Sequence, residues 1–368
     1  MLHFLFWLFV SIVFIQFIYY VLVFSNFSFA KIEKSTVKNI PISVIVCTKN
    51  DQINVQKYIP LLTNQNYPNF EIVLIDDASS DDTLEIFEQF KKQFANIKIV
   101  KVANNEAFWG NKKFALTLGI KAATHEHLLF TDADCYPTST NWIAEMSSYF
   151  DNQKTIVLGF SGYHLNSNTL FTKLIRFESV LNAMQYFSWA KIGKPYTANG
   201  KNLAYTKSEF FKTNGFINHM KIRSGSDSLF INEATNKNNT AICFSKNSFT
   251  ISEIDINFMQ WFKQIQKQSA TSKHYKMPDK LQLKLFNLSQ ILVIALPIIL
   301  LLYVINWQIV TGLIIFRYIF TWIILGYSAA KLNEKKVMYF FPIVEIMLVI
   351  VQLNIFVANL FSKQPKWK

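Results

Sequence analysis

Long apolar stretches at both ends of the chain restrict its fold more than any other feature of the sequence. The first runs from Leu2 to Phe24, with His3, Ser11 and Gln16 as its mildly polar interruptions. Three more follow at 285–305, 309–330 and 338–361. Because about 20 apolar residues can cross a bilayer, the sequence predicts an N-terminal transmembrane anchor over 1–25. It also predicts a C-terminal membrane region of two or three spans over 285–361.

A cleaved signal peptide is the alternative for the first stretch. It lacks a basic start and a small-residue cleavage site, which favours an anchor. The sequence leaves two alternatives for the membrane topology of the C-terminal region. Four full spans would place the basic tail Ser362–Lys368 outside the cell, whereas its lysines favour the inside. The last stretch, which contains Pro342 and Glu345, is therefore either a span or a re-entrant or interfacial segment.

The lysines gather beside the apolar stretches. The chain carries a formal net charge of +13, yet it has no basic patch with interleaved aromatic residues, so nucleic acid is not an expected partner. The distribution follows the positive-inside pattern and suits an anionic lipid surface. It predicts a multi-pass protein of the inner (cytoplasmic) membrane, with its central region facing the cytosol. The lysines concerned are Lys31, Lys34, Lys38, Lys263, Lys267, Lys273, Lys276, Lys280, Lys284, Lys331, Lys335 and Lys336.

The central region alternates strand and helix patterns. The three cysteines, Cys47, Cys135 and Cys243, show no pair spacing, in keeping with a reducing cytosol. Alternation at these lengths predicts βαβ units, a mostly parallel sheet and the α/β class. The expected strands are 41–47, 70–77, 97–102 and 127–131, and the expected helices end near Asn64, Phe94 and Ala123, the last beginning at Asn111.

Two carboxylates follow the fourth predicted strand. Asp132 and Asp134 are one residue apart, so an extended backbone places them on one face. Hard oxygen ligands there could hold Mg²⁺ or Mn²⁺, which could bridge a diphosphate. Asp51, Asp76 and Asp77 also fall at strand ends, where ligands of parallel sheets bind. The sequence therefore predicts a site at this edge, with solvated turns as the alternative.

Further residues are candidates for contacts to a nucleotide. The turn from Thr48 to Asp51 offers backbone donors and a carboxylate, and Asp77 could accept hydrogen bonds from a uracil or ribose. Lys112 or Lys113, after Trp109-Gly110, could meet a phosphate; the alternative is a solvated lysine at a helix start. The sequence has no Gly-rich phosphate loop, which argues against P-loop and Rossmann dinucleotide sites.

A hydroxyl acceptor must lose a proton as it attacks, so displacement chemistry needs a base. Asp227 lies in Ser224–Phe230 among small residues that leave room for an acceptor. The alternative is a helix N-cap, because an apolar run follows. Glu233 is the next candidate for a base.

Together these motifs resemble a family 2 glycosyltransferase of the GT-A fold. The similarity covers about 41–275 and rests on several motifs in the same order. They are Ser43–Asp51, Val73–Thr83, Gly110–Ala123, Phe130–Trp142, Asn199–Tyr205 and Gly215-Phe216. The resemblance implies a catalytic domain over 41–260, followed by a basic interfacial segment over 261–284. Integral-membrane members of the family often carry spans at both ends.

The resemblance also implies roles for single residues. Asp77 would contact the nucleoside, Asp132 and Asp134 would form the metal-binding motif with Asp134 the direct ligand, and Asp227 would be the base. It implies a hexosyl transfer from a nucleotide sugar, usually uridine-linked, with inversion in one displacement. The metal would offset charge on the departing diphosphate.

Two departures from the family pattern narrow the expected activity. The acidic pair is reduced to Ser226-Asp227, and the Gln-x-x-Arg-Trp motif of processive synthases becomes Gln264–Gln268, with Lys267 for arginine and no tryptophan. Lysine keeps the charge but not the planar fork. One-sugar transfer to a lipid or lipid-linked acceptor is therefore expected. The alternatives are a processive polysaccharide synthase, a nucleotide-sugar-binding protein without turnover, and a transport or scaffold subunit.

The membrane part contains ionisable groups and a basic amphipathic segment. Trp261–Tyr275 is expected to form an interfacial helix, with Trp261 and Phe262 facing lipid. Arg317 and Glu345 lie inside apolar stretches, where charges are costly. Either they pair with each other or Arg317 contacts a lipid phosphate.

Overall fold

The described chain groups into two units, each assembled from separate stretches of sequence. The computed structural model describes residues 2–32, 36, 38–103, 112–222 and 224–361. The sheet unit contains Ile32–Asn166 and Gly193–Ile256. The helical unit contains the chain up to Lys31, Ser167–Ile192 and the part from Asn257 onward. Lys34, Trp109-Gly110, Asn111 and the tail from Ser362, all named above, lie outside the described residues.

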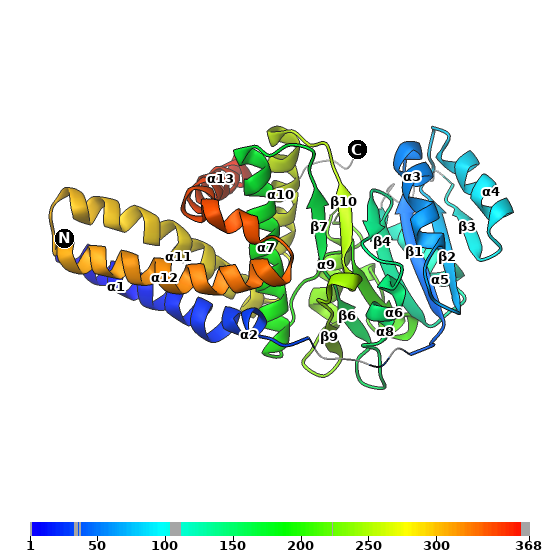
Figure 1. Cartoon of the computed structure of the whole chain (residues 1–368), viewed down its shortest axis with the longest axis horizontal. Coiled ribbons are helices and arrows are strands. Elements are labelled where there is room, and N and C mark those ends of the chain that lie inside the picture. The colour runs from blue at the N-terminus through cyan, green and yellow to red at the C-terminus, as the bar shows by residue number, and fades with distance from the viewer. Residues whose placement is uncertain (1, 33–35, 37, 104–111, 223, 362–368) are drawn as a thin grey trace. The chain divides into compact units, whose positions relative to one another are not determined.

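A seven-stranded, mostly parallel sheet is the centre of the sheet unit (Figure 1). Its strands are β1 (Ile42–Thr48), β2 (Phe70–Asp76), β3 (Ile97–Lys101), β4 (His127–Asp132), β6 (Ile156–Leu158), β8 (Leu203–Thr206) and β9 (Thr240–Ile242). They lie in the order β3-β2-β1-β4-β8-β6-β9. Strand β8 runs antiparallel to both neighbours, and the other pairs are parallel. The expected α/β class and the four expected strands are confirmed.

A small second sheet and several helices complete this unit. The sheet has the order β5-β10-β7, with β5 at Cys135–Pro137, β7 at Ser161–His164 and β10 at Thr250–Glu253. The α-helices are α3 (Gln52–Thr63), α4 (Thr83–Gln93), α5 (Lys112–Ala122), α6 (Trp142–Ser147), α8 (Lys207–Lys212) and α9 (Ser226–Ala234), with 3₁₀ turns at Ile217–His219 and Lys246–Ser248.

Helices cover both faces of the sheet, which explains why the middles of β1 and β2 are apolar on both faces. Val44 and Val46 point to the face covered by α3, α4 and α6, where Trp142 is fully buried. Ile45 and Ile75 point to the other face, against α5. A Cβ on Gly119 of α5 would lie 2.1 Å from Ile75 Cδ1, so glycine allows this helix to approach the sheet. The fold thereby fixes the carboxyl edge of β1, β2 and β4.

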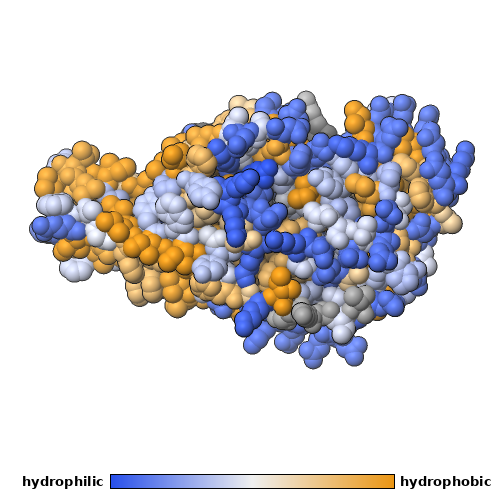
Figure 2. Space-filling model, viewed as in Figure 1, coloured by the Kyte–Doolittle hydropathy of each residue, from blue (hydrophilic) through white to orange (hydrophobic). Residues whose placement is uncertain are grey.

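The helical unit contains the apolar stretches. Its elements are α1 (Leu2–Phe17), a π-helical segment (Ile18–Phe24), α2 (Ser25–Ser28), α7 (Leu170–Lys191), α10 (Phe258–Ser272), α11 (Met277–Leu302), α12 (Trp307–Lys331), a 3₁₀ segment (Lys335–Phe340) and α13 (Phe341–Phe361). Among the described residues, Leu2–Ser28, Met277–Leu302, Trp307–Lys331 and Lys335–Asn359 are helical, long and apolar enough to cross a membrane. Apolar side chains cover much of their visible surface (Figure 2).

The basic amphipathic helix exists, but one of its expected features is wrong. Helix α10 begins with a capping box between Asn257 and Gln260. Trp261 does not face lipid: it is 2% exposed and packs edge-to-face on Phe171 of α7. The α7 pattern went unnoticed in the sequence, and α7 supplies the cover for Trp261. Phe258 is 47% exposed and is the aromatic residue that α10 presents outward.

A buried polar layer joins four helices of this unit. Arg317 of α12 donates from Nη1 to Glu345 Oε2 of α13 over 2.6 Å, and both side chains are almost fully buried. Arg317 Nη2 also donates to Gln290 Oε1 at 3.1 Å and to Gln16 Oε1 at 3.4 Å. Gln16 in turn donates to Ser289 Oγ at 2.6 Å. Of the two readings of Arg317, the ion pair is therefore the one observed.

Candidate active site

Strand register places the predicted acidic residues along one edge of the sheet. Cys47 of β1 pairs with Asp132 of β4, and Thr48 pairs with Asp76 of β2. The chain then turns so that the Asp77 backbone N–H donates to the Thr48 carbonyl oxygen over 2.9 Å. Since β1 lies between β2 and β4, residues from three separate segments meet beyond its carboxyl end.

Asp132 is held by a lysine of the preceding helix. Lys112, the first residue of α5, lies with Nζ 2.6 Å from Asp132 Oδ1. Burial opposes the charge on this lysine, but Asp132 and Asp227 outweigh it and raise the pKa of Lys112 above its usual value. A protonated lysine between two carboxylates is well placed to meet an incoming phosphate.

Lys113 has a different surrounding. Its side chain is 1% exposed, and Nζ donates to the carbonyl oxygens of His219 and Ile222 at 2.8 and 2.7 Å. Burial lowers the pKa of Lys113 to about 8. This lysine fixes the turn that leads to Asp227, so the structure separates two residues between which the sequence could not choose.

Asp134 has polar contacts at both carboxylate oxygens. Oδ2 accepts from Lys201 Nζ and from Ser252 Oγ, both at 2.7 Å. Oδ1 accepts from Cys135 Sγ at 3.2 Å. Burial disfavours the ionised form, but Lys201 reverses this effect and holds the pKa of Asp134 below its usual range. Lys201 thus favours the ionised form of Asp134.

The remaining nucleotide-contact candidates surround the end of β1. Thr48 is buried at the strand end. Asp51 precedes α3, where Oδ1 accepts from Asn54 Nδ2 at 2.8 Å and the backbone N–H donates to Thr83 Oγ1 at 3.0 Å. Asp77 is 8% exposed, and burial raises its pKa. Burial, with smaller contributions from Asp134, Asp81 and Asp132, raises the pKa of Asp51.

Asp227 lies in the first turn of α9, but it is not the N-cap. Gly225 takes that position with a left-handed φ of 73°, so the cap interpretation of Asp227 is wrong. Burial and Asp132 raise the pKa of Asp227, while Lys112 partly offsets them. Glu233 is six positions further on, so α9 turns it away from the face that carries Asp227. Glu233 Oε2 accepts from Asn218 at 3.3 Å instead.

Three residues of the Asn199–Tyr205 motif complete the candidate site, although no role was predicted for them from the sequence. A Cβ on Gly200 would lie 2.0 Å from Asp227 Oδ2, so only glycine lets the carboxylate sit there. Lys201 pairs with Asp134. Asn202 anchors the turn by donating to the carbonyls of Phe160 and Ser248, each at 2.7 Å. The motif itself was the signal that could have found them.

Asp132 and Asp134 fit a divalent cation whose remaining coordination positions are filled by a bound substrate and water. The described residues contain no group of three or more His, Cys, Asp or Glu side chains able to hold a metal. Mg²⁺ is commonly bound by one or two carboxylates, with substrate phosphates and water filling the other positions. Asp132 and Asp134 supply such a pair, although each is paired with a lysine.

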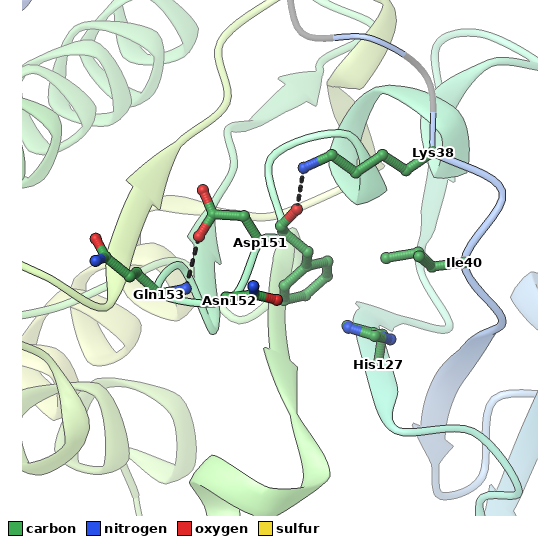
Figure 3. A pocket seen from close by; sticks show the side chains of 7 residues that line it. Lys38, Ile40, His127, Asp151, Asn152 and Gln153 are labelled. Atoms are coloured by element: carbon green, nitrogen blue, oxygen red, sulfur yellow. Dashed lines mark hydrogen bonds between the residues drawn. The ribbon is translucent and has the colours of Figure 1, made fainter.

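A surface cleft lies at the opposite edge of the sheet and takes no part in this group. It is lined by Lys38, Ile40, His127, Phe150, Asp151, Asn152 and Gln153. His127 pairs with Ile42 at the amino ends of β4 and β1. Figure 3 shows Lys38 reaching the Phe150 carbonyl oxygen and Asp151 accepting from the Gln153 backbone, which are internal contacts.

Comparison with known proteins places this geometry in context. A family model described as glycosyl transferase family 2 matches residues 43–228. A poly(ribitol-phosphate) β-glucosyltransferase of Bacillus spizizenii is 30% identical over 120 residues, 32% of this chain and 18% of that protein. A UDP-Glc:α-D-GlcNAc-diphosphoundecaprenol β-1,3-glucosyltransferase of Escherichia coli is 24% identical over 131 residues, 36% of this chain and 49% of that protein. The matches thus span less than half of these relatives.

A solved structure resembles nearly the whole chain. The mannosyltransferase PcManGT of Pyrobaculum calidifontis, in complex with GDP-Man and Mn²⁺, matches with a TM-score of 0.60 and 15% identity. The match covers 91% of this chain and 99% of that one. At this identity the likeness establishes a common fold.

Proposed function

Because the chain belongs to glycosyl transferase family 2, we propose that it is a membrane-bound inverting enzyme that moves a hexose from a nucleotide donor, a UDP-sugar, to a lipid or lipid-linked acceptor. The observation that carries the proposal is the meeting of Asp77, Asp132, Asp134 and Asp227 at one sheet edge, beside Lys112. The apolar helices and the relative that acts on a diphosphoundecaprenol-linked sugar support a lipid-linked acceptor in glycolipid or cell-envelope polysaccharide synthesis.

The proposed chemistry is a single displacement. The acceptor oxygen bonds to the anomeric carbon as the bond from that carbon to the diphosphate oxygen breaks, and Asp227 takes the acceptor proton. Lys112 faces the departing diphosphate, while Thr48, Asp51 and Asp77 hold the nucleoside end. Asp132 and Asp134 would hold Mg²⁺ or Mn²⁺, which supplies charge neutralisation at the leaving group. We place the catalytic region, 41–260, on the cytosolic side of the inner membrane.

A screen of nucleotide sugars against extracted lipids tests this proposal. Purified full-length protein in detergent is incubated with each donor in Mn²⁺, Mg²⁺ or excess chelator, and products are identified by mass spectrometry. We expect one donor to label a lipid-soluble product in the presence of a divalent cation. Donor hydrolysis or transfer absent for every nucleotide sugar would reject an enzyme.

The metal role needs its own variant. Asp134→Ala should abolish divalent-dependent transfer without unfolding the protein. Asp151→Ala is the matched control, because that aspartate lies at the opposite sheet edge. Full activity of the Asp134 variant, or of the wild type in chelator, would reject a role for a divalent cation in transfer.

A further inference from the structure

Lys201 holds the carboxylate that the proposed metal needs. Its Nζ lies 2.7 Å from Asp134 Oδ2 and 2.7 Å from Ser252 Oγ, and Ser252 Oγ lies 2.7 Å from the same carboxylate oxygen. The three polar groups therefore form a closed triangle. The Lys201 side chain is mostly buried in this arrangement.

The backbone of Lys201 is fixed independently of its side chain. Its carbonyl oxygen accepts from Thr131 Oγ1 at 3.1 Å and from Thr250 Oγ1 at 2.9 Å, and its N–H donates to Asn199 Oδ1 at 3.1 Å. The flexible four-carbon stem can thus swing while the turn stays in place. The Tyr163 ring, 5.9 Å from Nζ, offers a cation–π position outside the triangle.

A divalent cation on Asp134 would lie beside an ammonium group that already occupies Oδ2, one of the two carboxylate oxygens. Lys112 already stands on the neighbouring carboxylate, Asp132. If a divalent metal bound while both lysines stayed in place, the two aspartates would carry an excess of positive charge. Like charges at contact distance repel strongly in a partly buried site. The donor diphosphate relieves the repulsion because it brings negative charge.

From this geometry we propose that Lys201 is a resident cation that occupies Asp134 in the free enzyme and leaves it when a divalent metal binds together with the donor. The inference rests on the proposed function. It makes Lys201 a positioning residue that couples metal binding to donor binding. The free enzyme binds metal weakly, and the displaced ammonium is available to the diphosphate.

Binding of Mn²⁺ tests the proposal without any measurement of turnover. Free Mn²⁺ is followed by its electron paramagnetic resonance signal with full-length protein in detergent, with and without UDP, and Asp134→Ala defines the portion bound at this site. In the wild type we expect UDP to tighten Mn²⁺ binding. In Lys201→Met we expect Mn²⁺ alone to bind about tenfold tighter than in the wild type, with a smaller effect of UDP.

Lys101→Met is the matched control, because it removes the same charge from a surface pair with Glu88. If Lys201→Met does not fold, Lys201→Gln carries the same expectation. Unchanged or weaker Mn²⁺ binding in the Lys201 variants would overturn the displacement, as would wild-type binding that is equally tight without UDP. If no protein binds Mn²⁺ at Asp134, with or without UDP, the proposed metal site is rejected, and so is the displacement of Lys201.

Discussion

The surroundings of two aspartates of the candidate site shift their pKa values in opposite directions. Burial works against ionisation at both, and it raises the pKa of Asp227. At Asp134 the Lys201 ammonium reverses the effect and lowers the pKa. Environments that push paired carboxyl groups apart commonly mark their roles in acid–base chemistry. Asp227 is accordingly suited to accept a proton, and Asp134 to remain an anion.

Replacing Asp227 by asparagine should remove turnover and spare donor binding. General bases typically contribute about a hundred- to ten-thousand-fold, so the kcat of Asp227→Asn should fall on that order. In the proposed mechanism Asp227 faces the acceptor, so UDP-sugar binding measured by calorimetry should change little. If the variant keeps more than about a tenth of the wild-type kcat, the base lies elsewhere and Glu233 is tested next.

The same variant should be more stable than the wild type at neutral pH. The folded state raises the pKa of Asp227, so the ionised carboxylate destabilises the fold, and its protonation removes that cost. The stability difference should therefore vanish below the pKa of an unfolded aspartate, about 3.9. It should grow as the pH rises through the higher folded pKa. Thermal unfolding of both proteins across this range checks the sign; a less stable Asp227→Asn at neutral pH would point to a structural role.

Gly200 should support catalysis by leaving space for the Asp227 carboxylate. In Gly200→Ala the new methyl group would overlap the Asp227 carboxylate and displace it. We expect kcat to fall at least tenfold, as misplacing a reacting group by about an ångström can cost a hundredfold. Combining Gly200→Ala with Asp227→Asn should give less than the product of the two losses. Independent, multiplicative effects would mean that Gly200 acts on something else.

At the scale of whole elements, the sequence predicted what its local pattern encodes. Apolar runs identify β1, β2 and β4, of which β2 and β4 end in aspartates, and alternating helices imply their parallel order. Lys201 and Gly200 were missed because their partners, Asp134 and Asp227, are distant in sequence, and their contacts depend on a turn held by Asn202. The α7 helix was missed because it is buried on several sides and shows no single apolar stripe.

The polar layer that joins α1, α11, α12 and α13 should be a main source of stability in the helical unit. Arg317→Met leaves Glu345 charged and buried, which typically costs about 3–5 kcal/mol. Thermal unfolding in detergent should show a large loss for this variant. The Arg317→Met/Glu345→Leu double variant should recover much of it, since no lone charge remains.

The matched control for this pair is Arg176→Met, which breaks a more exposed ion pair with Glu334 in the same unit. We expect a smaller loss there, because solvent reaches Arg176 and Glu334, 31% and 13% exposed, more than it reaches Arg317 and Glu345. Equal losses at Arg317 and Arg176 would show that the buried layer has no special role.

At the scale of the whole molecule, the segment that follows the family match bears on how many sugars the proposed enzyme adds. The family match ends at residue 228, and the segment beyond it includes α10, where the processive motif is degenerate. Lys267 in this helix keeps a positive charge without the bidentate fork of arginine. This difference is expected to limit how firmly a growing polymer is held.

Purified protein should therefore add one sugar, or very few, to each acceptor. Mass spectrometry of products at limiting acceptor should show a single mass increment, even after prolonged incubation with excess donor. A ladder that extends to long homopolymer would show that the missing tryptophan has little bearing on chain extension.

The position of α7 in the chain has a consequence for how this enzyme can be made and divided. The polypeptide leaves the sheet after β7, builds α7, and returns to supply β8 in the middle of the sheet. Phe177 and Phe187 of α7 are buried against Phe341 and Phe27 of the helical unit. Removing the apolar segments at both termini would therefore expose the apolar side chains of α7, an internal helix. A version without the apolar segments is therefore expected to need a short hydrophilic bridge in place of 167–192, so that β7 still connects to β8.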